Sequence, residues 1–114
     1  MAYRKPDTLL PLETSILGVV GSRGAHGAHG FVIARELAGG DLESKRLVGH
    51  GTLYKALDRL RSRGLLTAEW EDAGVAEAAG RPRRRVYWIT AAGSAALSRV
   101  QTADRAFRIG EAPA

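Results

Sequence analysis

Residues 51–64 read GTLYKALDRLRSRG, and the rest of the predicted fold is arranged around this stretch. Its apolar side chains recur at the i, i+3, i+4, i+7 spacing of an amphipathic helix, at Leu53, Ala56, Leu57 and Leu60. Gly49 is a suitable N-cap for this helix, and Gly64 is a suitable residue to end it. The polar side chains fall on the opposite side, which leaves that side of the helix available to a partner.

After Gly64 the spacing of the apolar residues changes from helical to alternating. Leu66, Ala68 and Trp70 alternate with polar residues, which is typical of a half-buried β-strand. A second strand is predicted over residues 83–89, which are rich in side chains that favour strands. The two strands form a hairpin, and the segment between them, rich in Ala, Gly and Glu, is expected to be a long mobile loop.

Two shorter helices are predicted before the central helix. The first begins at Pro11, because proline is well tolerated in a first turn, and ends in residues 21–24, where glycines interrupt the pattern. The second covers residues 31–38 and is closed by the two glycines that follow it. The repeat GAHGAHG at residues 24–30 does not match a phosphate-binding loop, so we interpret it as a connector.

A last helix is predicted over residues 91–109, with Thr90 as its N-cap. Its apolar stripe has no further element of the chain to pack against, which indicates a second copy of the chain as the partner. The alternative is that this helix folds back onto its own domain. We expect the dimer contact to be made by Leu97, Val100, Ala103 and Phe107.

Three helices, a two-stranded hairpin and a last helix predict an α+β, mostly helical fold: a winged helix-turn-helix with a C-terminal dimerisation helix. In this fold the third helix can enter a DNA major groove about 12 Å wide, and the hairpin, or wing, lies along the flanking backbone. We assign residues 1–8 to an N-terminal arm, 9–90 to the DNA-binding domain, 91–109 to the dimerisation helix and 110–114 to a flexible tail.

The charge of the 114-residue chain favours a polyanionic partner, because 17 Lys and Arg against 12 Asp and Glu give a net charge of +5. Four arginines fall within residues 81–85, where they repel one another unless phosphates lie between them. A solvated strand that discourages edge pairing is the alternative interpretation. The residues that we expect to contact double-stranded DNA are His50, Thr52, Tyr54, Lys55, Arg59, Arg81, Arg83, Arg84 and Arg85.

Several classes of function are not expected. Cysteine is absent, which excludes disulfides, thiolate zinc sites and cysteine nucleophiles. No cluster of three or four ligands gathers around His26, His29 or His50, so we expect no metal site, no cofactor and, without a catalytic constellation, no enzyme. The chain also shows neither a run of about 20 apolar residues nor a secretory signal, so we expect a cytoplasmic protein without a membrane partner.

In order and spacing, the residues resemble the PadR family of winged-helix transcriptional regulators, in its short subgroup with one C-terminal helix. The resemblance covers residues 9–100, and the chain departs from it at Gly49-His50, where the family commonly has Ser-Pro, and at Lys55, where the family has proline. The matching motifs are Ile16-Leu17-Gly18, His29-Gly30-Phe31 with Ile33 and Leu37, Gly51-Thr52-Leu53-Tyr54 with Leu57, Arg59-Leu60 and Gly64-Leu65, Trp70-Glu71, Gly80-Arg81-Pro82-Arg83-Arg84 with Tyr87, and Thr90 with Gly93 and Leu97.

The resemblance implies a homodimer that represses transcription and that a small molecule releases from DNA. For an aromatic or cationic effector, we expect a cavity at the dimer centre, although tryptophan in a hairpin more often serves packing. Two other functions stay open: a winged domain that binds a protein through its basic wing, and a metal-responsive regulator. The candidate effector residues are Tyr3, Trp70, Trp88 and Phe107.

Overall fold

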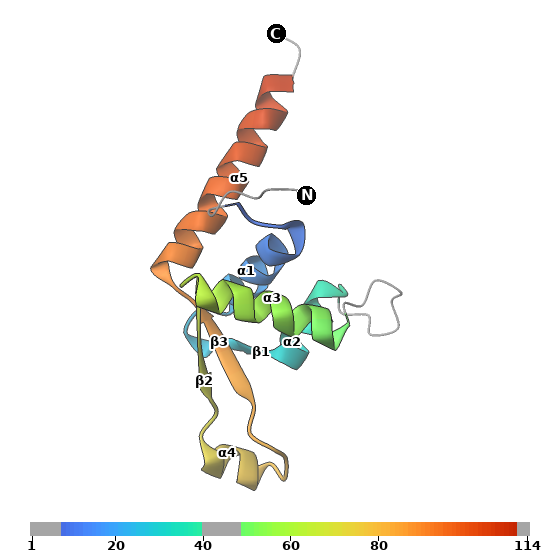
Figure 1. Cartoon of the computed structure of the whole chain (residues 1–114), viewed down its shortest axis with the longest axis vertical. Helices are drawn as coiled ribbons and strands as arrows, with labels where there is room; N and C mark the ends of the chain where they lie inside the picture. The colour runs from blue at the N-terminus through green and yellow to red at the C-terminus, as the bar shows by residue number, and fades with distance from the viewer. Residues whose placement is uncertain (1–7, 40–48, 112–114) are drawn as a thin grey trace.

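The computed structural model describes residues 8–39 and 49–111 and, within them, the side chains of all residues except 50 and 104–111. The chain adopts the predicted, mostly helical α+β fold of a winged helix-turn-helix (Figure 1). Its elements are α1 (Pro11–Arg23), the 3₁₀ helix η1 (Gly24–His26), β1 (Ala28–His29), α2 (Gly30–Leu37), α3 (His50–Ser62), β2 (Leu66–Trp70), α4 (Ala73–Ala78), β3 (Arg85–Ile89) and α5 (Ala91–Glu111).

The sheet has one strand more than the sequence predicts. β1 lies in the GAHGAHG repeat, for which we expect only a connector, and it pairs antiparallel with β3. The strands of this sheet follow the order β1-β3-β2. A strand of two residues shows no alternation in the sequence, so periodicity alone misses it.

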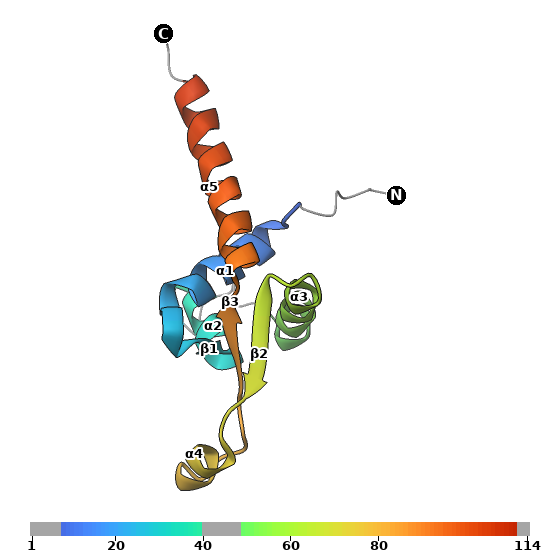
Figure 2. The ribbon, with the colours of Figure 1, turned by 90° about the vertical axis from the view of Figure 1, so that its left-hand side faces the viewer.

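The tip of the wing also differs from the prediction, because it contains the short helix α4 in place of a plain loop (Figure 2). Asp72 caps this helix, since its carboxylate accepts a hydrogen bond from the backbone N–H of Gly74 at 2.7 Å. A helix of six residues is too short for a helical period to stand out in the sequence.

The core lies where α1, α2 and α3 pack against one another and against the sheet. Because the apolar stripe of α3 is buried there, the opposite side of this helix is held toward solvent. The fully buried hydrophobic side chains include Ile16, Leu17 and Val20 of α1, Ile33 of α2, Leu53, Ala56, Leu57 and Leu60 of α3, and Leu66 of β2.

One buried carboxylate joins α1 to α3. Glu13 is fully buried, and its Oε2 accepts a hydrogen bond from Nε of Arg59 at 2.9 Å. Its Oε1 accepts a hydrogen bond from the backbone N–H of Leu10 at 2.9 Å and lies 3.7 Å from Nη1 of Arg63. Glu13 therefore caps the start of α1 and orders the flank of α3 at the same time.

The first turns of α5 pack against the domain. Thr90 caps the helix as predicted, because its Oγ1 accepts a hydrogen bond from the backbone N–H of Gly93 at 3.0 Å. A Cβ at Gly93 would overlap the carbonyl group of Leu65, so glycine lets α5 lie directly on the chain there. Beyond the buried Ala96, α5 extends away from the body (Figures 1 and 2). No helix among the described residues has both the length and the apolar character needed to cross a membrane.

Candidate nucleic-acid interface

The outer side of α3 faces the base of the wing across a hollow of about 360 Å³, which we call the helix hollow. α3 contributes the side that lies opposite its buried apolar stripe. β3 contributes the side chains that face this side of α3. Gly51, Tyr54, Lys55, Asp58, Arg85 and Tyr87 line this hollow.

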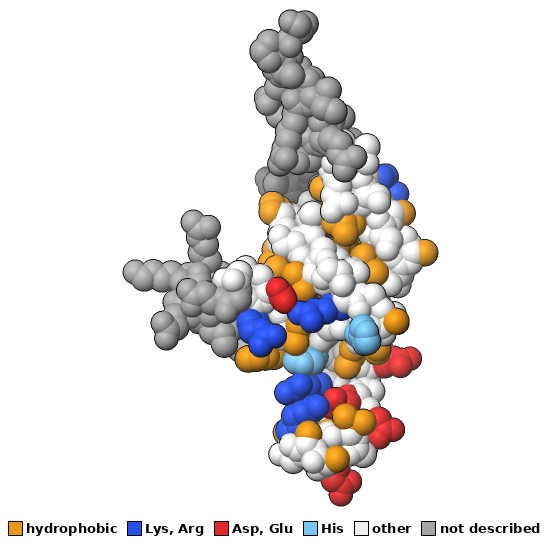
Figure 3. All heavy atoms as spheres, turned by 180° about the vertical axis from the view of Figure 1, so that it is seen from behind, with side chains coloured by type: hydrophobic (Ala, Val, Ile, Leu, Met, Phe, Trp, Pro, Cys, Tyr) orange, Lys and Arg blue, Asp and Glu red, His pale blue; other side chains and the backbone are white. Residues whose placement is uncertain are grey.

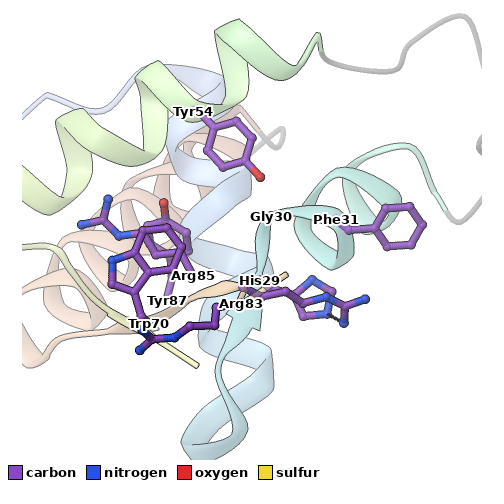
Figure 4. Close-up of a pocket in the computed structure, with 9 residues that line it drawn as sticks. His29, Gly30, Phe31, Tyr54, Trp70, Arg83, Arg85 and Tyr87 are labelled. Atoms are coloured by element: carbon purple, nitrogen blue, oxygen red, sulfur yellow. Dashed lines mark hydrogen bonds between the residues drawn. The ribbon is translucent and has the colours of Figure 1, made fainter. Parts of the chain in front are cut away.

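A second hollow of about 430 Å³, which we call the wing hollow, lies between the start of α2, α3 and the wing (Figure 4). Its lining residues are His29, Gly30, Phe31, Tyr54, Trp70, Arg83, Arg84, Arg85 and Tyr87. Tyr54, Arg85 and Tyr87 line both hollows, so the exposed side of α3 and the arginines of the wing surround one concave surface.

Tyr54 occupies the middle of this surface, and Gly30 makes room for it. The hydroxyl group of Tyr54 points toward Gly30 at the start of α2 (Figure 4), and a Cβ at Gly30 would overlap it. Tyr54 is 44% exposed although it belongs to a well-packed helix. Its side chain is therefore held across the mouth of the wing hollow, and the missing Cβ of Gly30 allows this.

Glu71 organises the base of the wing. Its carboxylate accepts hydrogen bonds from Nη1 and Nη2 of Arg81 at 2.5 and 2.9 Å, and its carbonyl oxygen accepts one from Nε of Arg83 at 2.8 Å. The hydrogen bonds from Arg81 lower the pKa of Glu71 to about 2, so the carboxylate is ionised at neutral pH. Arg81, one of the predicted DNA contacts, thus closes the hairpin within the domain.

Arg84 binds His29. Nη1 of Arg84 lies 3.0 Å from Nε2 of the imidazole. Burial, and then the positive charge of Arg84, lower the pKa of His29 below its ordinary value of 6.5. The neutral ring is the form that can accept a hydrogen bond from a guanidinium. His29 thereby directs Arg84 toward the wing hollow.

The three arginines that follow Pro82 form no ion pair with an acidic side chain that the structure describes. Among the described side chains, the ion pairs of the wing involve only Arg81, and none involves Arg83, Arg84 or Arg85. Seen from behind, basic side chains gather where the wing meets the body, and acidic side chains lie beside them and toward the tip of the wing (Figure 3). The wing hollow, which these three arginines line, therefore has a cationic rim that can receive anionic groups.

The other predicted DNA contacts on α3 have different positions. Thr52 and Lys55 are exposed, and the side chain of His50 lies outside the described residues. Arg59 is bound to Glu13 on the flank that faces α1, and its side chain is 42% exposed. Its first role is thus to compensate a buried charge.

Of the four predicted effector residues, the structure describes the side chains of Trp70 and Trp88. Directly opposed residues share a face of an antiparallel sheet, and Trp70 is opposite Arg85 whereas Thr67 is opposite Trp88. Trp70 and Trp88 therefore lie on opposite faces of the sheet and do not line one cavity within this chain. Trp88 donates a hydrogen bond from Nε1 to the carbonyl oxygen of Ala25 at 3.0 Å. The other two candidates, Tyr3 and Phe107, lie outside the described residues.

The predicted dimer residues divide into two groups. Leu97 packs against the core of its own domain, so part of the predicted stripe is used within the chain. Val100 is half-buried and Ala103 is exposed, on the part of α5 that leaves the body. Phe107 lies outside the described side chains.

Neither of the two histidines whose side chains are described belongs to a cluster that could bind a metal ion. Within the described part of the chain, no three His, Asp or Glu side chains are close enough to hold a metal ion. His26 is exposed in η1, whereas His29 binds Arg84.

Sequence reasoning missed the structural roles of Glu71, Glu13 and Gly30. Glu71 appears in the sequence as part of an acidic run, and only the hairpin brings it opposite Arg81. Glu13 falls on the apolar face of α1, with Ile16 and Leu17 at i+3 and i+4, which is a signal of a paired buried charge that could have been noticed. The close approach of Gly30 and Tyr54 is purely tertiary and leaves no sequence signal.

Comparisons with known proteins found one matching family and several similar solved structures. The model of the transcriptional regulator PadR-like family matches residues 16–99. Among solved structures, a PadR-like transcription factor from Bacteroides fragilis is similar over 87% of this chain and 84% of that chain, with 25% identity and a TM-score of 0.68.

Two further structures are similar. A Streptococcus mutans UA159 protein matches with 25% identity and a TM-score of 0.65, over 96% of this chain and 88% of its own. A PadR family transcriptional regulator from Eggerthella lenta DSM 2243 matches with 27% identity and a TM-score of 0.61, over 85% of this chain and 77% of its own. No curated protein sequence matches the chain.

Proposed function

Because the chain belongs to the PadR-like family of transcriptional regulators, we propose that it binds an inverted-repeat operator in double-stranded DNA as a homodimer. The observation that carries the proposal is the shared concave surface, where Tyr54 and Lys55 of α3 adjoin Arg83, Arg84 and Arg85 of the wing. A recognition helix in the major groove and a basic wing on the neighbouring backbone require this arrangement.

The division of labour follows from the side chains. Arg83, Arg84 and Lys55 bind phosphates, which fixes the position of the domain on the duplex without selecting a sequence. The exposed side of α3 around Tyr54 faces the base edges and supplies the selection. Lys55 adds affinity more than specificity, because a flexible ammonium group binds a phosphate as a point charge.

The long α5 supports a homodimer. The helix extends away from the body (Figure 1). Val100 is half-buried and Ala103 is exposed, and a second copy crossing this helix would cover them. A twofold dimer presents two recognition helices to half-sites about 34 Å apart, which is one turn of DNA.

We further propose that the protein acts in the cytoplasm as a repressor and that a small molecule releases it. A ligand releases a DNA-binding protein only if it binds more tightly to a form that fits the operator less well. The expected result is that compounds that raise the melting temperature of the free protein lower its affinity for DNA, as fluorescence anisotropy would measure.

The test of the proposed function is a fluorescence-anisotropy titration of the full chain. Duplexes enriched by the protein from a random-sequence pool should share an inverted repeat and bind far more tightly than a mixed-sequence duplex. Binding to the mixed-sequence duplex should weaken steeply with salt. A chain that enriches no sequence and does not bind duplex even at low salt would instead favour the protein-binding winged domain.

Val100→Glu is expected to make the protein monomeric, because two carboxylates would meet in the apolar dimer contact. Sedimentation equilibrium should give twice the mass of one chain for the wild type and the mass of one chain for the variant. Ser98→Glu adds the same charge on the opposite side of α5 and should stay dimeric. A Val100→Glu chain that remains dimeric would place the dimer contact elsewhere.

A further inference from the structure

Trp70 is the most exposed large hydrophobic side chain in the part of the chain that the structure describes, at 60%. Phe31 and Tyr54, about half exposed, line the same wing hollow. Single aromatic side chains on a surface need no explanation, but several around one concave surface indicate a contact site. Trp70 lies on the core-facing side of β2, yet beyond the end of the core, so its own domain does not cover it.

Arg85 holds the indole of Trp70 in place. The two residues are directly opposite each other in the β2–β3 ladder, so their side chains leave the same face of the sheet. The guanidinium carbon of Arg85 lies 5.9 Å from the ring centres of both Trp70 and Tyr87, within the range of a cation–π contact. The indole is thus ordered in advance, which reduces the conformational entropy that binding would cost.

The charges around the indole indicate which partner covers it. Arg83 and Arg84 line the same hollow without a described acidic partner, and Lys55 lines the adjoining helix hollow. A strand of duplex DNA offers phosphates together with the less polar faces of the deoxyribose rings between them. We propose that Trp70 packs against the deoxyribose rings of the strand whose phosphates bind these arginines, an inference that rests on the proposed DNA-binding function.

This contact has a physical signature that differs from that of the arginines. A phosphate contact releases counterions, so removing it flattens the dependence of affinity on salt. Apolar packing releases no counterions, so removing it lowers the affinity by a similar factor at every salt concentration. Because every nucleotide carries a deoxyribose, the effect should appear with any duplex sequence.

Trp70→Ala is therefore expected to lower the affinity for a mixed-sequence duplex about tenfold, with the slope of log K against log salt unchanged. Anisotropy titrations at several salt concentrations measure both quantities. Arg85→Lys keeps the charge and loses the planar stacking partner, so it should weaken binding severalfold with the same slope. Trp88→Phe is the matched control and should bind as the wild type does, since Trp88 lies on the opposite face of the sheet.

The control variant also provides a direct reporter. The chain has two tryptophans, so the Trp88→Phe chain has Trp70 as its only indole. Its emission is expected to change when the mixed-sequence duplex is added and not when inorganic phosphate is added. Circular dichroism of each variant verifies that the fold is retained.

The outcomes separate the inference from the function on which it rests. A wild-type chain that binds no duplex would overturn both. If the wild type binds duplex but Trp70→Ala binds equally well and the emission of Trp70 does not respond, the proposed function stands and the indole contact is wrong. The apolar contact would also be contradicted if Trp70→Ala made the slope of log K against log salt shallower without lowering the affinity.

Discussion

A chain carrying Arg83→Ala and Arg84→Ala is expected to bind duplex DNA about sixtyfold more weakly at about 0.1 M salt, because each lost phosphate contact costs about eightfold there. The slope of log K against log salt should become shallower by about two units. Both arginines line the wing hollow, and neither forms an ion pair with a described residue. Anisotropy titrations over a range of salt concentrations measure the affinity and the slope together.

The matched control removes the same charge elsewhere. Arg23 and Arg99 line neither hollow, so the double variant Arg23→Ala, Arg99→Ala should retain most of the affinity and of the slope. Because the net charge of the two double variants is identical, the comparison separates local contacts from the general attraction between a basic protein and DNA. Equal losses in both variants would mean that the wing makes no particular contact.

Glu13→Ala is expected to destabilise the domain by about 3 kcal/mol, near the lower end for breaking a buried ion pair. The lower end applies because Arg59, 42% exposed, can be solvated once its partner is removed. The variant also loses the acceptor for the backbone N–H of Leu10 at the start of α1. Urea denaturation followed by circular dichroism measures the change in the free energy of unfolding.

Two further variants locate the effect. Glu13→Gln keeps an oxygen that can accept from Leu10 and Arg59 and should cost less than the alanine variant. Arg59→Ala should cost little more in the Glu13→Ala background, because the two side chains act as one pair. Additive losses would show that Arg59 stabilises the domain independently of Glu13.

The four longer helices, α1, α2, α3 and α5, were predictable from the sequence because each carries its own period. The stripe from Leu53 to Leu60 specifies both the existence of α3 and the side that it buries, and Thr90 marks the start of α5 by its capping hydroxyl. β1 and α4 were not predictable, because elements of two and six residues are too short to show a period. β1 forms by pairing with β3, and α4 forms in the segment that joins β2 to β3.

The candidate interface was predictable as a set of basic residues, but not as a geometry. Sequence could place Arg81, Arg83, Arg84 and Arg85 on the wing, yet Arg81 turns toward Glu71 while Arg84 turns toward His29. These pairings join residues that are distant along the chain or opposed across the hairpin. Two residues of the same type in one segment thus have different roles, which only the tertiary structure separates.

The two tryptophans show the same limit. The sequence pattern alone places Trp70 and Trp88 together, as aromatic side chains of one predicted hairpin. The pairing of β2 with β3 places them on opposite faces, because side chains alternate along a strand. The pairing register of β2 with β3 would have been enough to assign the two tryptophans to opposite faces, but the sequence does not specify this register uniquely.

The central claim is that α3 and the wing face the same DNA duplex, and the absence of cysteine allows a direct measurement. An iron chelate that cleaves DNA can be attached to a single new cysteine, at Asp58→Cys on α3 or at Ala79→Cys at the tip of the wing, both of which are exposed. Ser98→Cys on α5 is the control. On the enriched operator, the first two chains should cleave neighbouring positions of one half-site, and the control should not cleave there. Cleavage from α3 without cleavage from the wing, or the reverse, would contradict the account.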